Sequence, residues 1–417
     1  MEQCIQVIRA REILAATGRP TIETVVQTSG GLRVSASVPC GTSIGKYEAC
    51  DVRDGGSRFR GQGVLRAVAN VNTILAPCLQ GRSLLDLAAI DRAMIELDGT
   101  PNKSRLGANA ILSVSLACAK AGALVSGQPL YRYLWKRPGV QLPGPAATVL
   151  AGRTRISQKL GFEDYLYVLK DFPTFANALE ALVEIRLVIQ EELEQRYGTL
   201  PEIGDALVPP ISSTTQAFDI MLEVLHRLGC QSQVGLGLDA AAGHCFEAKT
   251  RLYAFEGTRI STPELHELYQ RLAADYPLIY LEDPFQEDDF AEFALLRQKL
   301  PECQIVGDDL FATNPKRILN CLRKAAADAV LLKPNQIGTV TEALEAAQCA
   351  EKAMTLMASI RSHDTEDPFL ADFAVAVRAD LIKLGSPVRA ERNAKYNRLL
   401  EIEQDEEPLL RKGPPCK

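Results

Sequence analysis

The sequence predicts an α/β fold, a TIM-like (β/α)8 barrel preceded by an N-terminal α+β domain. The main observation is a series of six short apolar runs in the second half of the chain, each ending in a charged residue. These charged residues follow one another at steps of 43, 26, 25, 28 and 22 residues. A strand, a helix and two loops take about 25–30 residues, so the spacing is typical of βα units in a parallel barrel. The runs are residues 234–239, 278–282, 304–308, 329–333, 355–361 and 381–383.

The region up to residue 140 has a different pattern, which predicts the α+β domain. Residues 21–28 alternate between apolar and polar side chains, Ser29-Gly-Gly31 forms a turn signal, and residues 32–38 alternate again. This pattern predicts a β-hairpin. Helical periodicity follows over residues 62–80, 85–97 and 107–126. A sheet followed by helices is typical of an α+β domain, which we assign to residues 1–140.

The barrel domain is predicted to begin at residue 141 and to end at residue 405. The proline-rich stretch at residues 142–145 marks its start. Two further strands are expected near residues 146–150 and 165–169, which brings the number of barrel strands to eight. Helical segments are expected at about residues 174–196 and 213–229. Residues 406–417 are predicted to form a frayed C-terminal tail.

Composition and charge exclude several classes of protein. The 417 residues include 46 basic and 52 acidic side chains, a net charge of −6, and no basic block of the kind that binds nucleic acid. No signal peptide is apparent, and no apolar run approaches the roughly 20 residues that span a bilayer. The eleven cysteines are scattered, odd in number and without a CxxC pair. We therefore expect reduced thiols in a cytoplasmic protein that binds neither nucleic acid nor membranes.

Three carboxylates end consecutive predicted barrel strands. Because the carboxyl ends of barrel strands meet at one mouth, Asp239, Glu282 and Asp308 are expected to point at one spot. A single Asp after a strand is more often a helix N-cap, but three in register are typical of a site for a hard divalent cation. Asp309, which directly follows Asp308, is expected to face the other way and to serve structurally.

Two lysines and an arginine end the remaining strands. Lys333 follows an apolar run, and near a metal we expect a lowered pKa that suits a general base. Lys383 is likewise flanked by apolar residues and should point inward. Arg361 and Ser362 suit a phosphate, because a guanidinium group forks onto its oxygens. The barrel mouth is therefore predicted to bind a divalent metal and a small anionic, phosphorylated substrate.

Eight stretches spread along the chain carry a resemblance to a known family. They are Gly18-Arg-Pro-Thr21, Val38-Pro-Cys-Gly-Thr-Ser43, Asp98-Gly-Thr-Pro-Asn-Lys103, Leu106-Gly-Ala-Asn-Ala110, Leu281-Glu-Asp-Pro-Phe285, Gly307-Asp-Asp-Leu310, Lys333-Pro-Asn-Gln-Ile-Gly338 and Glu391-Arg-Asn-Ala-Lys-Tyr-Asn397. Through these stretches the sequence resembles the enolases over nearly its whole length. The resemblance implies an enolase-type barrel that converts 2-phosphoglycerate to phosphoenolpyruvate in glycolysis, with Mg²⁺ as cofactor and a homodimer as the assembly.

The resemblance also implies roles for individual residues. Asp239, Glu282 and Asp308 would hold the tightly bound Mg²⁺, and Ser43, on a loop, would close over a second one. Lys333 would remove the proton from C2 of the substrate, and Lys383 would bind the substrate carboxylate. Arg361 and Ser362 would hold the phosphate.

The departures from the family pattern fall on the acid that helps the C3 hydroxide leave. Ala206 stands where the family has the glutamate of a Gly-Asp-Glu-Gly-Gly segment, and Asp164 replaces a second glutamate. Arg155 and Ile360 replace two active-site histidines. A general acid contributes roughly 10²–10⁴-fold in rate, so the family mechanism needs a substitute here. Asp164 is the candidate, with Glu163 and Asp205 as alternatives if the loop brings them within reach.

Three interpretations are compatible with these observations. The first is an enzyme that still dehydrates 2-phosphoglycerate. The second is an enolase-like enzyme with an altered second step, in which Arg153 and Arg155 face an extra phosphate, phosphonate or carboxylate group. The third is a non-catalytic binding or scaffold protein. Buried unpaired charges cost several kcal/mol, so a scaffold gains nothing from the retained ligands and base. We take the family reaction as the expectation.

Overall fold

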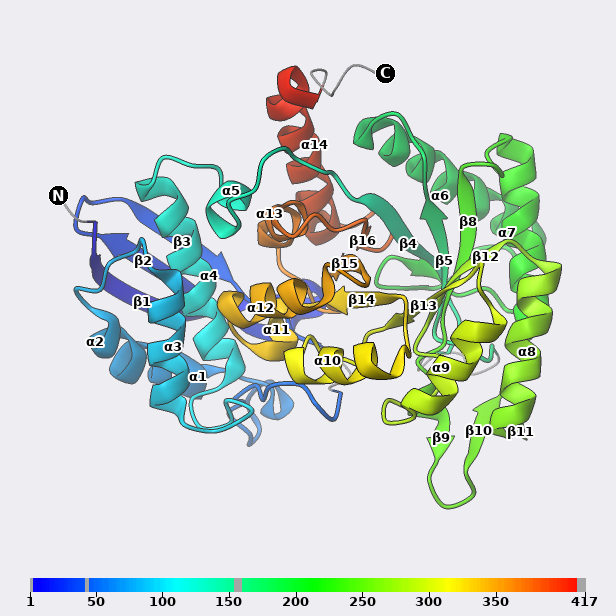
Figure 1. Cartoon of the computed structure of the whole chain (residues 1–417), viewed down its shortest axis with the longest axis horizontal. Coiled ribbons are helices and arrows are strands. Elements are labelled where there is room, and N and C mark those ends of the chain that lie inside the picture. The colour runs from blue at the N-terminus through cyan, green and yellow to red at the C-terminus, as the bar shows by residue number, and fades with distance from the viewer. Residues whose placement is uncertain (1–2, 42–44, 154–159, 411–417) are drawn as a thin grey trace.

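The structure of the protein is a computed structural model that describes residues 3–41, 45–153 and 160–410. An N-terminal domain with an antiparallel sheet lies beside a closed eight-stranded barrel (Figure 1). The predicted fold class, a TIM-like barrel with an N-terminal α+β domain, is confirmed. The proposed division at residues 140 and 141 stays a prediction, and the first barrel strand begins at Gly144.

The N-terminal sheet has three antiparallel strands in the order β1-β2-β3. The predicted hairpin is present as β2 (Pro20–Thr28) and β3 (Arg33–Ser37), whereas β1 (Ile5–Leu14) was not predicted. Helix α4 packs against β2 and β3. The helices of this domain are α1 (Leu65–Asn70), α2 (Ala76–Leu79), α3 (Leu87–Asp98), α4 (Ala108–Val125) and α5 (Leu130–Leu134).

Helix α4 corrects the expectation that no apolar segment is long enough to span a membrane. Its 18 residues have a mean hydropathy of 1.6, so length and composition alone would allow a span. Of that segment, 83% is buried inside the protein, where α4 contacts α3, α5, β2 and β3. Packing at the centre of the N-terminal domain therefore explains its apolar character.

All eight predicted barrel strands are present, and pairing between β16 and β4 closes the barrel. The strand order around the barrel is β4, β5, β8, β12, β13, β14, β15 and β16. Their bounds are β4 (Gly144–Ala151), β5 (Asp164–Leu169), β8 (Val234–Asp239), β12 (Leu278–Glu282), β13 (Gln304–Gly307), β14 (Ala329–Leu332), β15 (Thr355–Ser359) and β16 (Leu381–Lys383).

The expectation of an all-parallel barrel is wrong at one strand. β5 runs antiparallel to both of its neighbours, β4 and β8. Only 12 residues separate Ala151 from Asp164, and a connection this short favours antiparallel order, because a parallel crossover takes a dozen or more residues and usually a helix. The reversal has a functional consequence, because it places the first residue of β5 at the mouth where the other strands end.

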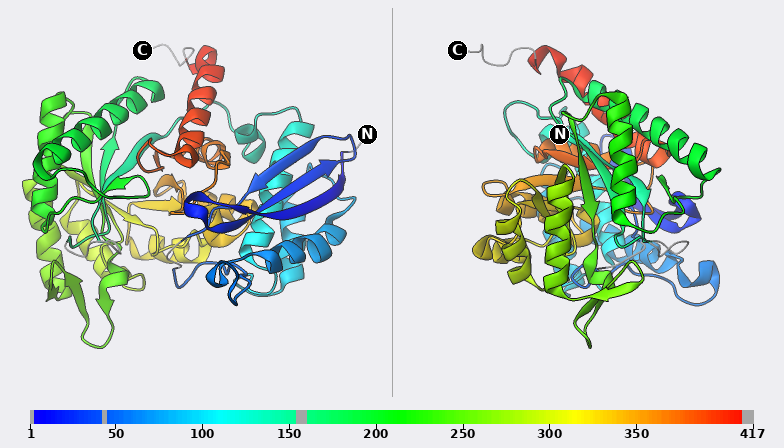
Figure 2. Two further views of the ribbon diagram at one scale, coloured as in Figure 1. Left: turned by 180° about the vertical axis from the view of Figure 1, so that it is seen from behind. Right: turned by 90° about the vertical axis from the view of Figure 1, so that its right-hand side faces the viewer.

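Helices cover the outside of the barrel, and a small second sheet projects from it (Figures 1 and 2). That sheet, in the order β11-β10-β9, lies in the long 43-residue step after Asp239 and was not predicted. The remaining elements are α6 (Phe175–Tyr197), β6 (Glu202–Ile203), β7 (Ala206–Leu207), α7 (Thr214–Leu228), β9 (Phe246–Glu247), β10 (Leu252–Phe255), β11 (Thr258–Ile260), α8 (Thr262–Asp275), α9 (Phe290–Lys299), α10 (Pro315–Lys324), α11 (Pro334–Ile337), α12 (Val340–Ala350), α13 (Phe369–Ala376) and α14 (Ala390–Leu410).

The C-terminal helix extends into residues 406–410, which were predicted to belong to a frayed tail over residues 406–417. Helix α14 continues to Leu410, and Glu406 is buried at its side. The Glu406 carboxylate accepts hydrogen bonds from Arg132 (2.7 Å) and from the Tyr131 hydroxyl (2.5 Å). This ion pair holds the end of α14 against the N-terminal domain. Residues 411–417 lie outside the described part of the chain.

Candidate active site

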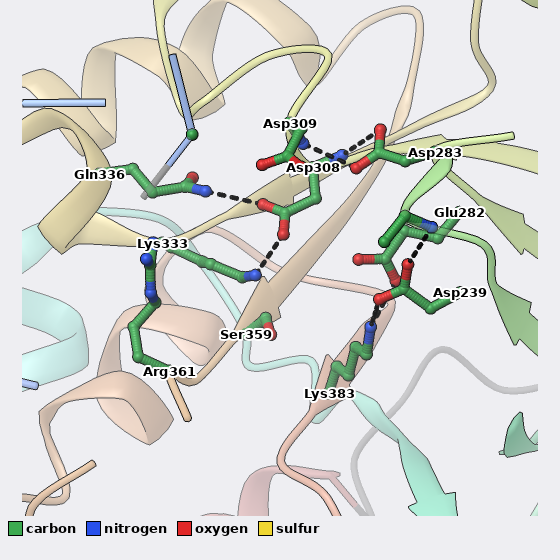
Figure 3. A network of polar contacts seen from close by, with 12 residues as sticks. Asp239, Glu282, Asp283, Asp308, Asp309, Lys333, Gln336, Ser359, Arg361 and Lys383 are labelled. Carbon is green, nitrogen blue, oxygen red and sulfur yellow. Dashed lines mark hydrogen bonds and ion pairs between the residues drawn. The ribbon is translucent and has the colours of Figure 1, made fainter. Parts of the chain in front are cut away.

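The structure brings the three predicted carboxylates together at the barrel mouth (Figure 3). Asp239 is the last residue of β8, Glu282 is the last residue of β12, and Asp308 directly follows β13. Asp239 and Glu282 are paired across adjacent strands. Glu282 is fully buried, and the described residues offer its Oε1 atom no hydrogen-bond partner.

Lys383, the last residue of β16, lies between two of these carboxylates. Its Nζ donates to Asp239 Oδ2 (2.7 Å) and to Glu282 Oε2 (2.6 Å). Burial would lower the pKa of Lys383, but the two carboxylates outweigh burial and raise that pKa well above its usual value. Lys383 is therefore a fixed positive charge at the mouth of the barrel.

The contact with Asp308 raises the pKa of Lys333, and the lowered pKa expected beside a metal stays a prediction. The Lys333 ammonium donates a short hydrogen bond to Asp308 Oδ2. Burial acts to lower the pKa of Lys333, but the Asp308 charge outweighs burial and the pKa is raised. Asp308 responds in the opposite direction, since Lys333 overcomes the effect of burial and lowers the Asp308 pKa. Lys333 is thus protonated whenever Asp308 is its counter-ion.

Asp164 reaches the same mouth because β5 is reversed. It is the first residue of β5 and is paired with Asp239 on β8 and with Ala151 on β4. The Thr148 hydroxyl donates to Asp164 Oδ2 (3.1 Å). Burial raises the pKa of Asp164 to about 7, with Lys383 opposing and Asp239 adding to the rise. A carboxyl group with this pKa is about half protonated at pH 7, so its protonated form is available to act as a general acid.

Asp283 and Asp309 lie next to the predicted carboxylates, and the structural role expected of Asp309 stays a prediction. Sequence reasoning assigned no role to Asp283, yet its carboxylate accepts the backbone N–H groups of Asp308 (3.2 Å), Asp309 (2.7 Å) and Leu310 (3.4 Å). Asp283 therefore shapes the loop that carries Asp308. Asp309 does not lie on the strand, which ends at Gly307, so strand alternation does not set its direction. Its carboxylate lies 3.8 Å from His244 Nε2 at the same rim.

The predicted phosphate-binding residues are only partly described. Arg361 is buried and pairs with Glu48 Oε2 (2.8 Å), and Figure 3 shows it beside Lys333. Arg361 also fills the space beside Gly41, where a Cβ atom would come within 2.0 Å of Nη2. Ser362 is exposed on the loop after β15. Ser43 and Arg155 lie outside the described residues.

Arg153 does not face a substrate group as the second interpretation expected. Its guanidinium donates to the backbone oxygens of Gly161 (3.1 Å), Ala240 (3.3 Å) and Ala241 (3.1 Å) and contacts Cys245. These contacts tie the loop after β4 to the loop after β8. The Arg153 side chain is therefore occupied by the protein itself.

Two of the residues that depart from the family pattern, Ala206 and Ile360, pack among apolar side chains. Ala206 is buried in a small apolar cluster with Ala151 and Val208, and Ile360 packs against the main hydrophobic core. Asp205 cannot replace the lost acid where it lies, because it accepts the backbone N–H of Ser386 and lies 3.4 Å from Arg392. Glu163, the other alternative, pairs with His244 (3.4 Å) and Arg153 (3.8 Å). Of the three acids, Asp164 is the one whose carboxylate borders the Asp239–Lys383 pair.

The donor set fits a hard divalent cation. Among the described residues, Glu282, Asp283 and Asp308 each offer an oxygen atom within 4.8 Å of the others. Three backbone N–H groups bind the Asp283 carboxylate, whereas Asp239 accepts one backbone N–H and shares Lys383 with Glu282, so we take Asp239 as the third ligand. Burial, together with the Asp239 charge, raises the pKa of Glu282, which shows how unfavourable the clustered negative charge is without a cation. Carboxylate oxygens are the ligands that Mg²⁺ prefers.

Comparison with known proteins covers both parts of the chain. The family "Enolase, N-terminal domain" matches residues 5–134, and the family "Enolase, C-terminal TIM barrel domain" matches residues 139–408. A protein named enolase from Methanopyrus kandleri is 45% identical over 405 residues, 95% of each chain. One from Thermococcus kodakarensis is 42% identical over 407 residues, 96% of this chain and 94% of the relative.

A third relative gives the same result. The enolase from Methanocaldococcus jannaschii is 42% identical over 405 residues, which is 96% of this chain and 95% of the relative. The identity extends through both the N-terminal sheet and the barrel that carries the carboxylates, and it is high enough to assign the family. The chain belongs to the enolase family.

Proposed function

We propose that this chain is a glycolytic lyase that removes water from 2-phosphoglycerate to form phosphoenolpyruvate, with Mg²⁺ as its cofactor. The observation that carries the proposal is the placement of a half-buried lysine, Lys333, against a cluster of three carboxylates at the barrel mouth. Membership of the enolase family and the identity over the whole chain support the same reaction. The altered-substrate and scaffold interpretations gain no observation of their own, since Arg153 is occupied by backbone contacts.

Asp239, Glu282 and Asp308 would hold the Mg²⁺, and Ser43 would contribute to a second one. When bound, the cation supplies positive charge that stabilises the negative charge developing on the substrate. The unpartnered Oε1 of Glu282 and the unfavourable clustering of carboxylates support this assignment.

The remaining roles follow from the charges around the mouth. Lys333 takes the proton from C2 of the substrate, and Lys383 holds the substrate carboxylate as a fixed cation. Arg361 binds the phosphate together with Ser362, and Arg155 is a further candidate for contact with an anionic group. Glu48 neutralises Arg361 in the substrate-free site, so phosphate binding replaces or shares that contact.

Asp164 acts as the acid in place of the missing glutamate. The C3–O bond breaks, the Asp164 proton goes to the departing hydroxide to give water, and the electrons left at C2 form the new double bond. Burial raises the pKa of Asp164 to about 7, so that its protonated form is populated near neutral pH, and the Thr148 hydroxyl donates a hydrogen bond that orients the carboxyl group.

The proposal is tested by incubating the protein with 2-phosphoglycerate and Mg²⁺ in D₂O and following the mixture by NMR. Formation of phosphoenolpyruvate is the expected result. Deuterium entering C2 without phosphoenolpyruvate would contradict the dehydration but retain the base. The absence of both signals would overturn the proposed function.

Replacement of the acid separates the two half-reactions. In Asp164→Asn we expect phosphoenolpyruvate formation to fall by about 10²-fold, because an amide cannot protonate the hydroxide. Exchange of the C2 proton should persist, since it needs only Lys333. The same NMR experiment measures both quantities, and parallel loss of exchange and product would refute the acid role. Asp219→Asn, on the outer surface of α7, is a matched control.

We also propose a homodimeric, cytoplasmic protein that binds neither nucleic acid nor membranes. The scattered cysteines, of which the ten described ones form no disulfide with one another, and the net charge of −6 support the compartment and the lack of nucleic-acid binding. Light scattering coupled to size-exclusion chromatography measures the assembly, and a monomer at micromolar concentration would contradict the dimer.

A further inference from the structure

A closed ring of hydrogen bonds links Lys333 to Asp308 through Thr313 and Gln336. The backbone N–H of Lys333 donates to Thr313 Oγ1 (2.9 Å), and the Thr313 hydroxyl donates to Gln336 Oε1 (2.7 Å). Gln336 Nε2 then donates to Asp308 Oδ1 (2.8 Å). The Lys333 ammonium binds the other oxygen, Asp308 Oδ2, and this contact closes the ring (Figure 3).

The ring fixes which end of the Gln336 amide faces Asp308. Thr313 and Gln336 are 0% and 1% exposed, so protein groups must satisfy them. A reversed amide would set its carbonyl oxygen against the Asp308 carboxylate and would leave the Thr313 hydroxyl without an acceptor. The observed arrangement satisfies every member, and it gives Asp308 a neutral donor on one oxygen.

The backbone at Thr313 is held in an unfavourable conformation. Ala312 and Thr313 have φ angles of 46° and 52°, in the left-handed region, where a β-branched side chain is rare. This conformation is unfavourable for L-amino acids, because the Cβ atom comes too close to the following carbonyl oxygen. Strain of this kind persists where the surrounding structure determines it, and here it turns the Thr313 hydroxyl toward both Lys333 and Gln336.

We propose that Thr313 and Gln336 are positioning residues that aim the Asp308 carboxylate. By holding Oδ1, they leave Oδ2 directed at Lys333 and at the place where the cation would bind. The inference rests on the proposed function in one respect, the role of Asp308 as a metal ligand. Sequence reasoning assigned no role to either residue, although Gln336 lies in the Lys333–Gly338 stretch that carried the family resemblance.

The experiment measures Mn²⁺ binding, by electron paramagnetic resonance, to wild type, Thr313→Ala, Gln336→Leu and Thr313→Ser. Loss of a partner that orients a metal ligand typically weakens metal binding 10–100-fold. We expect that loss in Thr313→Ala and Gln336→Leu. Thr313→Ser keeps the hydroxyl and should bind Mn²⁺ within about threefold of wild type. Circular dichroism in EDTA checks that each variant is folded, and Gln336→Leu provides the test if Thr313→Ala does not fold.

Two results would overturn the inference. One is Mn²⁺ affinity equal to that of wild type in the folded Ala and Leu variants. The other is equal weakening in Thr313→Ser, because the hydroxyl would then be irrelevant. The proposed function can fail independently of this inference. If wild type forms no phosphoenolpyruvate but the variants still lose Mn²⁺ affinity, the positioning role stands and the proposed reaction is wrong.

Discussion

Lys333→Ala should abolish both exchange of the C2 proton and formation of phosphoenolpyruvate. Removal of a positioned general base typically costs roughly 10²–10⁴-fold in rate, and no other described lysine contacts Asp308. Exchange and product should fall together, because proton removal precedes loss of hydroxide. This pattern contrasts with Asp164→Asn, in which exchange should survive. Deuterium incorporation at C2 and phosphoenolpyruvate formation are measured by NMR in the same sample.

The ion pair with Asp308 determines when Lys333 can accept a proton. The Asp308 charge outweighs burial and raises the pKa of Lys333, so we expect Lys333 to act as a base when another group binds Asp308. The control is Lys352→Ala, an exposed lysine at the opposite end of the barrel, which should leave both signals unchanged. Retention of C2 exchange in folded Lys333→Ala would reject Lys333 as the base.

The strand ends could be predicted because the barrel repeats one simple pattern. Each of the six apolar runs is buried, and the charged residue that ends it lies at the mouth, so alternation of apolar runs and charges was sufficient. The short strands β6, β7 and β9–β11 have two to four residues and give too few positions for a periodic signal. β1 was missed as well, although it is ten residues long.

Features that depend on which side chains meet could not be predicted. β5 runs antiparallel to its neighbours after a short connection, and only this reversal explains why Asp164 lies beside Asp239. The pKa of Lys333 depends on a contact with Asp308, 25 positions earlier in the chain. Arg153 was expected to face a ligand because its backbone partners at Ala240 and Ala241 lie about 90 positions away. Local sequence carries no signal for such contacts.

The second large effect is expected from Glu282→Gln, which should remove the enzyme's response to Mg²⁺. Burial raises the pKa of Glu282 from 4.5 to about 8, so ionised Glu282 reduces the stability of the metal-free protein. A raised folded pKa means that this stability is present at acidic pH and is lost as pH rises toward 8. In EDTA at pH 9 the neutral glutamine should therefore make the variant more stable than wild type, and at pH 4.5 the difference should vanish.

In the presence of Mg²⁺, wild type should become more stable than Glu282→Gln. At a concentration 100 times its dissociation constant, a ligand that binds only the folded state stabilises it by about 2.7 kcal/mol. Wild type should show this gain, whereas Glu282→Gln should show none and should form no phosphoenolpyruvate, because one of three charged ligands is neutral. Urea unfolding with and without Mg²⁺ measures the gain, and Glu267→Gln, exposed on α8, is the matched control. If Mg²⁺ stabilises Glu282→Gln as much as wild type, the cation does not bind at Glu282. The loss of wild-type stability with rising pH in EDTA would then remain as an independent property of the buried carboxylate cluster.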